Sequence, residues 1–304
     1  MTDTTRTARL DGLPQALGAH AFWGVMPLYL VLVRTVHPIE FVAWRVVWTL
    51  PICLAVLAWR RQWSEVRAAF AHRRSLLLLI ASSTLVGINW VAYVLAVDTG
   101  HVFAASLGYY ILPLVMMLLG LVVLGEKLTA AQWGAVALAA AGVSLLAIDA
   151  RTTLWLSMTV AVTFGSYGLI RKVVAVGALA GLTVETLLLY LPALGIATWF
   201  GMTPAGSAMA QSPGLSASIL LGGVMTAVPL MLFATAARRM NYTTIGFLQF
   251  LSPTMVFVLG LTWFHEELKP AQLGCFVLIW SAMALFVWDL LRVRRKKATR
   301  TATS

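Results

Sequence analysis

The sequence predicts an all-α integral membrane protein with ten transmembrane helices, built as two inverted five-helix repeats. Three observations predict this class. Apolar runs of about 20 residues recur along the chain, and a helix needs that length to cross a hydrocarbon core of roughly 30 Å. Lys and Arg gather at alternate ends of these runs. One half of the chain also resembles the other at an offset of 140 residues.

The composition excludes a water-soluble domain. The 304 residues are 60% hydrophobic and only 11% charged, whereas soluble domains carry roughly 25% charged residues. The net charge of +11 could indicate nucleic acid, but the basic residues flank apolar runs and no nucleic-acid-binding motif is present. Cys53 and Cys275 both fall inside apolar runs, as is typical of small buried thiols. We expect no disulfide, no bound metal, no cofactor and no nucleic-acid partner.

Ten apolar runs predict the membrane spans to within a few residues. The third and fourth are the clearest, whereas Ser, Thr and Gly dilute the sixth and eighth. The first run is too long for a signal-peptide core and lacks a small-residue cleavage site, so we expect it to be retained. The predicted spans are 14–33, 39–59, 75–97, 102–124, 129–148, 153–171, 181–201, 217–236, 243–264 and 270–290.

The orientation follows from Lys and Arg, which are in excess in cytoplasmic loops. With the N-terminus in the cytoplasm, 18 of the 22 Lys and Arg residues fall inside and only Arg34, Arg151 and Lys269 fall outside. This split predicts an inner (plasma) membrane protein with both termini cytoplasmic. The predicted organisation is a cytoplasmic N-terminus (1–13), a first repeat (14–148), a linker (149–152), a second repeat (153–290) and a basic cytoplasmic tail (291–304).

The internal repeat places Ser106–Gly142 over Gly246–Ala282 without a gap. Five is an odd number, so the second copy enters the membrane from the opposite side. Carriers use such inverted repeats to build two gates around one midplane site. Matches of Pro, Gly, Glu and Gln are more informative than matches of Leu or Ala between apolar helices. They are Pro113 with Pro253, Gly120 with Gly260, Glu126 with Glu266, Gln132 with Gln272 and Gly134 with Gly274.

Polar and aromatic stripes around the two mid-helix prolines are candidates for the walls of a substrate cavity. A mid-helix proline frees a carbonyl and bends the helix, which lipid tolerates only where protein or water satisfies that carbonyl. The alternative is a pair of structural kinks with packing glycines. The stripe residues are Ser106, Tyr109, Tyr110 and Pro113 in helix four, and Gln249, Phe250 and Pro253 in helix nine.

Other spans carry further cavity candidates, although an intramembrane polar side chain more often hydrogen-bonds a neighbouring helix than a substrate. A cavity rich in Tyr, Trp, Phe and Met suits amphipathic or aromatic solutes. The further candidates are His20 and Trp23 in helix one, Asn89, Trp90 and Tyr93 in helix three, and Tyr167 in helix six.

Charged groups near or inside the spans need partners. Arg45 is the only full charge that the predicted boundaries place well inside a span. Burying it costs at least roughly 2.5–3.5 kcal/mol, so we expect a partner or a water-filled path, with snorkelling to the interface as the alternative. Glu40 and Glu185 fall in the first turns of their predicted helices, where a carboxylate stabilises the positive end of the helix dipole.

An enzyme is not predicted. The acidic and His residues of the expected outer face lack metal-ligand spacing on any one helix. The sequence also contains no Gly-rich phosphate loop and no nucleophile elbow.

Five segments give the chain a family resemblance that extends over about Leu17–Asp289. They are NWVAYVLAVDTGHVFAASLGYYILPLVMMLLGLVVLGEKL (Asn89–Leu128), GSYGLIRK (Gly165–Lys172), ETLLLYLP (Glu185–Pro192), TAVPLMLFATAARR (Thr226–Arg239) and FLQFLSPT (Phe247–Thr254). Together they resemble the RarD-like branch of the EamA group, within the drug/metabolite transporter superfamily. The resemblance implies ten helices, cytoplasmic termini and a permease for small metabolites or drugs. It also implies a cavity lined by the first four helices of each repeat, with the fifth peripheral.

The sequence departs from the family pattern at three polar positions. Trp44 stands where the family often has His before the helix-two Arg, and Leu112 where it often has Asn before the helix-four proline. Phe250 replaces a Tyr that commonly follows the helix-nine Gln. The small four-helix relatives couple to protons through a Glu in helix one, and helix one here has only His20, so the resemblance does not support proton antiport.

These features together predict a secondary carrier that moves small metabolites or drugs by alternating access around a midplane cavity. The expected partners are a small-molecule solute and the lipid bilayer, and a homodimer is possible. A non-transporting membrane partner or sensor is the second interpretation, and a membrane-embedded enzyme is the third.

Overall fold

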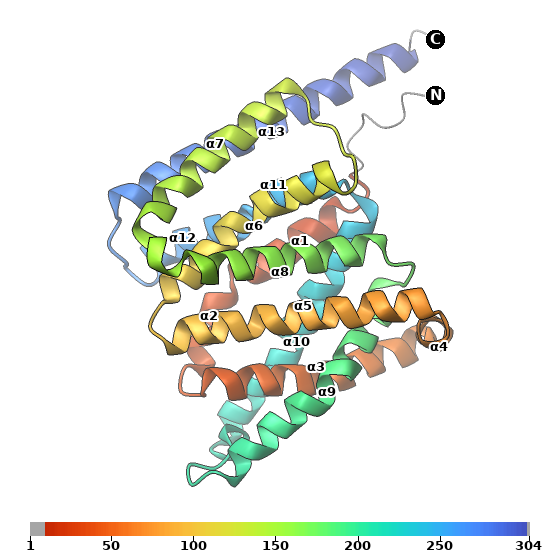
Figure 1. The fold of residues 1–304 in the computed structure, drawn as a ribbon, viewed down its shortest axis with the longest axis vertical. Coiled ribbons are helices and arrows are strands. Elements are labelled where there is room, and N and C mark those ends of the chain that lie inside the picture. The colour runs from red at the N-terminus through yellow and green to blue at the C-terminus, as the bar shows by residue number, and fades with distance from the viewer. Residues whose placement is uncertain (1–9, 303–304) are drawn as a thin grey trace.

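The computed structural model describes residues 10–302, without the side chains of 149–151 and 294–302, and the described chain is almost entirely helical (Figure 1). Most of the predicted N-terminal segment 1–13 and the last two residues of the predicted tail lie outside the described residues. Within 10–302, nine helices are long and apolar enough to cross a membrane, and no β-strand forms. The predicted all-α membrane class is therefore confirmed.

The first half of the chain contains nine helical elements. They are α1 (Leu13–Gly24), α2 (Met26–Leu30), η1 (Val31–Val33), α3 (Pro38–Arg60), α4 (Trp63–Ala71), α5 (Arg73–Asp98), α6 (Val102–Val122), α7 (Ala130–Ala147) and η2 (Ile148–Thr153). The second half contains α8 (Leu154–Val173), α9 (Ala178–Met202), η3 (Ala208–Ala210), α10 (Pro213–Arg239), α11 (Tyr242–Gln249), α12 (Leu251–Thr262) and α13 (Pro270–Ala302). The last helix continues through most of the predicted tail 291–304.

The sixth predicted span, 153–171, forms helix α8 but is not among the nine apolar spans of the described chain. Ser, Thr, Gly and Tyr lower its hydropathy, and Arg171 and Lys172 lie in its last turn. The helix packs against α5, α6 and α10, so its polar residues face other helices rather than lipid. The count of ten spans stays a prediction.

The loops gather at two ends of the bundle, each named here by a short helix that it contains. The α4 end, on the right in Figure 1, includes α4, the start of α1 and the turn between α6 and α7. The η3 end, on the left, includes η3, the turn between α5 and α6 and the turn between α12 and α13. Helix α4 falls between the predicted spans 39–59 and 75–97.

Helices α7 and α13 pack against each other at one edge of the bundle, at the top in Figure 1. Their close approach requires a glycine, because a Cβ atom on Gly142 would lie 3.0 Å from the carbonyl oxygen of Cys275. This placement agrees with the peripheral fifth helix that the family resemblance implies.

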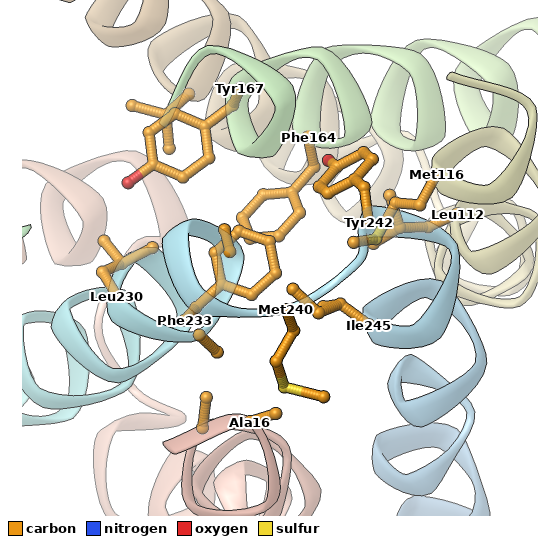
Figure 2. Close-up of a cluster of buried hydrophobic side chains, with 14 of the residues drawn as sticks. Ala16, Leu112, Met116, Phe164, Tyr167, Leu230, Phe233, Met240, Tyr242 and Ile245 are labelled. Atoms are coloured by element: carbon orange, nitrogen blue, oxygen red, sulfur yellow. The ribbon is translucent and has the colours of Figure 1, made fainter. Parts of the chain in front are cut away.

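An aromatic core occupies the space between α8, α10 and α11, as Figure 2 shows. The rings of Phe164 and Phe233 lie 5.4 Å apart, and the Phe233 ring stacks on Tyr167 at 6.5 Å. The Tyr242 hydroxyl donates a hydrogen bond to the Gly165 carbonyl at 2.5 Å. These contacts join three helices of the predicted second repeat. Leu112 and Met116 of α6, in the predicted first repeat, complete the cluster.

The two repeat-related prolines have different effects on their helices. Pro253 lies just after a break at Phe250 that divides the ninth predicted span into α11 and α12. Pro113 lies inside α6, which continues without a break from Val102 to Val122. The first span is interrupted in the same way as the ninth, between α1 and α2, close to Pro27.

Replacing Gly108 with Ala should destabilise the protein by roughly 1–3 kcal/mol, because overpacking forces helices apart. The added Cβ atom would lie 2.8 Å from Cβ of Val160 and 2.9 Å from the carbonyl oxygen of Ser157, both on α8. The measurement is unfolding of the detergent-purified protein. Gly195→Ala is the matched control, since nothing lies within 4 Å of its Cβ position and Ala gains about 0.5–1 kcal/mol in a helix. Equal losses in both variants would contradict the α6–α8 packing.

Candidate transport pocket and gate residues

A narrow pocket lies between α3, α5, α8, α9 and α10. It has room for only about one water molecule. The lining residues are Val46, Thr49, Val86, Trp90, Tyr167, Leu182, Glu185, Thr186, Leu189, Thr226 and Leu230.

A buried ion pair forms one wall of the pocket. Arg171 Nη1 lies 3.5 Å from Glu185 Oε1, and both side chains are almost fully buried. The Ser82 hydroxyl donates a short hydrogen bond to Glu185 Oε1, and the Tyr167 hydroxyl donates to Glu185 Oε2 at 3.5 Å. The Arg171 guanidinium also occupies the space where a side chain at Gly181 would begin, so a larger residue there would displace it. Helices α5, α8 and α9 thus meet at one carboxylate.

The sequence predicted different surroundings for both members of this pair. It counted Arg171 only as a charge on the cytoplasmic side, and the structure places it in the last turn of α8 with its side chain buried. The sequence also predicted that Glu185 caps the start of its helix, whereas α9 begins at Ala178, two turns earlier. Glu185 therefore lies as far into α9 as Arg45 lies into α3, so Arg45 is not the only charge well inside a helix. The sequence did contain a sign that both residues matter, because both fall in segments that carry the family resemblance.

Glu40 does lie in the first turn of its helix, α3, as predicted. Its carboxylate also binds a distant segment, because Oε1 accepts hydrogen bonds from the Ser207 hydroxyl at 3.0 Å and the Ala208 amide at 2.8 Å. The Trp44 indole donates to the same oxygen at 3.1 Å. Glu40 therefore attaches η3 to the start of α3.

Arg45 lies on α3 beside the pocket. Its Nε donates to the Thr226 hydroxyl at 2.8 Å, and its guanidinium lies 5.6 Å from the Phe41 ring centre and 5.8 Å from that of Trp90. Trp90 and Thr226 both line the pocket. Arg45 thus interacts with one hydroxyl and two aromatic rings, and not with a carboxylate.

Two predicted cavity residues, Trp90 and Tyr167, line the pocket. Two others, Tyr93 and Tyr109, lie near Arg45 with their rings 6.2 Å apart. Ser106 is exposed.

The other predicted cavity residues lie in packed positions. Asn89 donates to the Val160 carbonyl at 2.8 Å and to the Thr163 hydroxyl at 3.2 Å, the helix-to-helix role given above as its alternative. Tyr110 packs on Phe276 of α13 with ring centres 5.6 Å apart.

The remaining candidates from helices one, four and nine are likewise enclosed by protein. His20 is fully buried and Trp23 partly buried, with their rings 5.6 Å apart and Trp23 against the aromatic core. Pro113, Gln249, Phe250 and Pro253 are buried too.

The turn after α6 and the turn after α12 have the same hydrogen-bond pattern, although they lie at opposite ends of the bundle (Figure 1). The Glu126 amide donates to the Gly120 carbonyl at 3.0 Å, and the Glu266 amide donates to the Gly260 carbonyl at 2.9 Å. Both turns contain one left-handed residue, Gly125 in the first (φ 64°) and His265 in the second (φ 52°). The sequence match at an offset of 140 residues thus extends to backbone geometry.

The two glutamates of these turns differ in their partners. Glu126 accepts hydrogen bonds from the amides of Tyr242 and Thr243, at 2.7 and 2.8 Å, and from the Thr243 hydroxyl at 2.7 Å. It therefore caps α11 across the α4 end, an arrangement called here the Glu126 clasp. Glu266 is exposed and accepts no side-chain hydrogen bond within the described chain. Shifting Tyr242 and Thr243 by 140 residues identifies its equivalent partners as Val102 and Phe103, which are also exposed.

More contacts close the α4 end. Lys172 Nζ donates to the Ala237 carbonyl at 3.0 Å, and Arg238 Nη1 donates to the Val174 carbonyl at 3.2 Å. These bonds tie the end of α8 to the end of α10.

Within the described residues, no group of three His, Cys, Asp or Glu side chains could hold a metal ion.

The fold is that of a polytopic membrane protein, and comparison with known proteins identifies it as a membrane transporter. The EamA-like transporter family model matches residues 11–148. The chain is 39% identical to Protein RarD of Streptomyces exfoliatus, over 95% of this chain and 92% of that protein. It is 35% identical to Protein RarD of Escherichia coli (strain K12), over 94% and 97%, and 37% identical to the uncharacterized transporter YojE of Bacillus subtilis (strain 168), over 92% and 93%.

The chain therefore belongs to the EamA-like transporter family, as a RarD-like permease. A crystal structure with 16% sequence identity superposes with a TM-score of 0.73 over 94% of this chain and 99% of that chain, so the two share a fold.

Replacing Arg171 with Met should destabilise the protein by roughly 3–5 kcal/mol, because Glu185 would then be a buried charge without its partner. Replacing both residues, as Arg171→Met with Glu185→Leu, should recover most of that loss, since an apolar pair of similar volume needs no desolvation of charge. The measurement is unfolding of the purified protein in detergent. If the double variant loses as much free energy of unfolding as the two single variants lose together, the result would contradict a direct pairing.

Proposed function

We propose that this permease carries small organic solutes by alternating access, with ten spans arranged as two inverted five-helix repeats. The observation that carries the proposal is the one-sided closure of the bundle. The Glu126 clasp joins the two halves at the α4 end, while the equivalent turn at the η3 end has no such partner. A carrier requires this asymmetry, because its site opens to one side of the membrane at a time.

The repeated turn supports the inverted repeats. One hydrogen-bond pattern recurs at an offset of 140 residues and at opposite ends of the bundle, as an inversion of topology requires. The break at Phe250 in the ninth span, against the unbroken α6, fits two copies held in different conformations. The proposed repeats are 14–148 and 153–290, joined by 149–152.

The location of the pocket also supports a carrier. Helices α3 and α5 belong to the first proposed repeat, and α8, α9 and α10 belong to the second. A solute held there would touch both halves, so it could bias their relative position. The Lys and Arg excess puts the α4 end in the cytoplasm, so the structure would be closed to the cytoplasm. The inner (plasma) membrane is the proposed location.

Thiol labelling can test this proposal. Thr186→Cys, on a background of Cys53→Ala and Cys275→Ala, places one thiol in the pocket. We expect a membrane-impermeant thiol reagent to label it from the η3 side in right-side-out vesicles. Adding transported solute should increase labelling from the α4 side in inverted vesicles, because turnover exposes the pocket to each side in turn.

Leu191→Cys is the control, since that side chain is 75% exposed on the surface of α9 and should show no dependence on solute. Labelling of Thr186→Cys from one side only, under every condition and with every solute tried, would contradict alternating access. That result would favour a sensor or another non-transporting role.

A further inference from the structure

Arg45 and Arg171 differ in how they are partnered. The pair Arg171–Glu185 is the only ion pair among the described residues. Arg45 therefore has no acidic partner there, and Glu40, the nearest acid on its own helix, binds three other donors. A cation inside a membrane span is costly unless an anion or water reaches it. Its position seven residues after Pro38 puts Arg45 about 10 Å into the span at a rise of 1.5 Å per residue.

The end of the Arg45 side chain is free to bind a ligand. Only Nε is engaged, by the Thr226 hydroxyl, and neither Nη atom makes a hydrogen bond within the described chain. Thr226 in turn donates to the Gly222 carbonyl at 2.8 Å, so its oxygen is oriented to accept from Arg45. This leaves the planar two-nitrogen fork that pairs with a carboxylate through two parallel hydrogen bonds.

The surroundings of the fork are aromatic and continuous with the pocket. Phe41 and Trp90 face the guanidinium, and the phenols of Tyr29, Tyr93 and Tyr109 lie within its electrostatic reach. Beyond them, the pocket is lined mainly by Val, Leu and Thr side chains, with the Glu185 carboxylate, paired to Arg171, in one wall. A single cation with aromatic and aliphatic neighbours suits a monoanion with an apolar body. A phosphate dianion would require more positive charge.

We propose that Arg45 binds the carboxylate of a monoanionic organic solute, whose apolar body fills the pocket beside Trp90. This rests on the proposed carrier function and specifies its solute class. Thr226 is a positioning residue, because it fixes the guanidinium through Nε. The pocket in this structure is too narrow for such a body, so binding would widen it.

The test uses the full-length protein purified in detergent, with phenylacetate and phenylacetamide as probes. They share an aromatic body, and only the first is an anion. We expect phenylacetate to raise the melting temperature and to quench tryptophan fluorescence, and phenylacetamide to do neither at the same concentration. Arg45→Gln should weaken phenylacetate binding at least tenfold, while Arg45→Lys should retain part of it.

Arg34→Gln is the control, because Arg34 is exposed at the η3 end and should not affect binding. Equal binding of the two probes, or unchanged binding in a folded Arg45→Gln variant, would overturn the proposal. These outcomes are distinct from failure of the carrier function. Carboxylate binding through Arg45 without any flux in liposomes would reject transport alone, and flux of neutral solutes unaffected by Arg45→Gln would reject the solute class alone.

A different observation carries a second inference, about the turn at the η3 end. An added Cβ on Gly120 would lie 2.9 Å from Glu126 Oε2, and one on Gly260 would lie 3.1 Å from Glu266 Oε2. Both carboxylates are therefore held over the same point of their own helices. Only the Glu126 carboxylate also binds the N-terminus of another helix, through the amides of Tyr242 and Thr243.

We infer that the two clasps exchange. When the Glu126 clasp opens, Glu266 accepts hydrogen bonds from the amides of Val102 and Phe103 and caps α6 across the η3 end. The two amides belong to the first turn of α6, where orphan donors and the helix dipole favour a carboxylate. Each conformation then satisfies one carboxylate at the cost of exposing the other.

Glu126→Ala and Glu266→Ala should therefore shift the protein in opposite directions. With the Thr186→Cys reporter, Glu126→Ala should raise labelling from the α4 side severalfold, and Glu266→Ala should lower it. Glu267→Ala, the adjacent exposed carboxylate, is the control. If Glu126→Ala fails to fold, Glu126→Gln replaces it. Shifts in the same direction, or no shift with Glu266→Ala, would overturn the exchange.

Discussion

The structure depends on one constraint, which is that no charged or polar group inside a hydrocarbon layer can rely on bulk water. Arg171 and Glu185 satisfy it within the protein, joining three helices beside the pocket. Glu126 lies in a turn at the α4 end and caps a helix of the other half of the chain. Arg45 satisfies it only in part, through one hydroxyl and two rings. Partnered charges thus hold the bundle together, and the incompletely partnered one lies where a solute would enter.

The two repeat-related turns differ in whether their glutamate has a partner, and the proposed function rests on this difference. Both turns have the same backbone hydrogen bonds, so the sequence specifies one local structure twice. Their carboxylates nonetheless differ, because Glu126 binds the start of α11 and Glu266 is exposed. The difference lies in packing between the halves and not in the turns themselves. In the proposed exchange, the second conformation would satisfy Glu266 in place of Glu126.

The sequence predicted most of the fold because span length and hydropathy are local properties. The predicted spans 39–59 and 102–124 differ from α3 and α6 by two residues or fewer at each end. Helix α4 was missed because its nine residues are too short and too polar to register as a span. The placement of Arg171 depended on where α8 ends, and boundaries are the least reliable part of such predictions.

The candidate site was predictable only in part, because contacts between helices depend on residues that are far apart in the sequence. Trp90, Tyr167 and Arg45 were identified from their depth and polarity, and they do lie at or beside the pocket. Glu185 was assigned to a helix cap because its partners, Ser82 and Arg171, come from two other helices. The repeat identified Glu126 and Glu266 as equivalents, but it could not reveal that only one of them is engaged.

The central claim is that the two ends of the bundle open in alternation. Distances between paired spin labels test it most directly, with one pair at Lys127 and Asn241 on the α4 end and the repeat-related pair at Glu267 and His101 on the η3 end. The account predicts a short distance for the first pair and a long one for the second in the conformation described here. It also predicts that any condition that lengthens the first shortens the second. Distances that stay fixed, or that lengthen together, would contradict it.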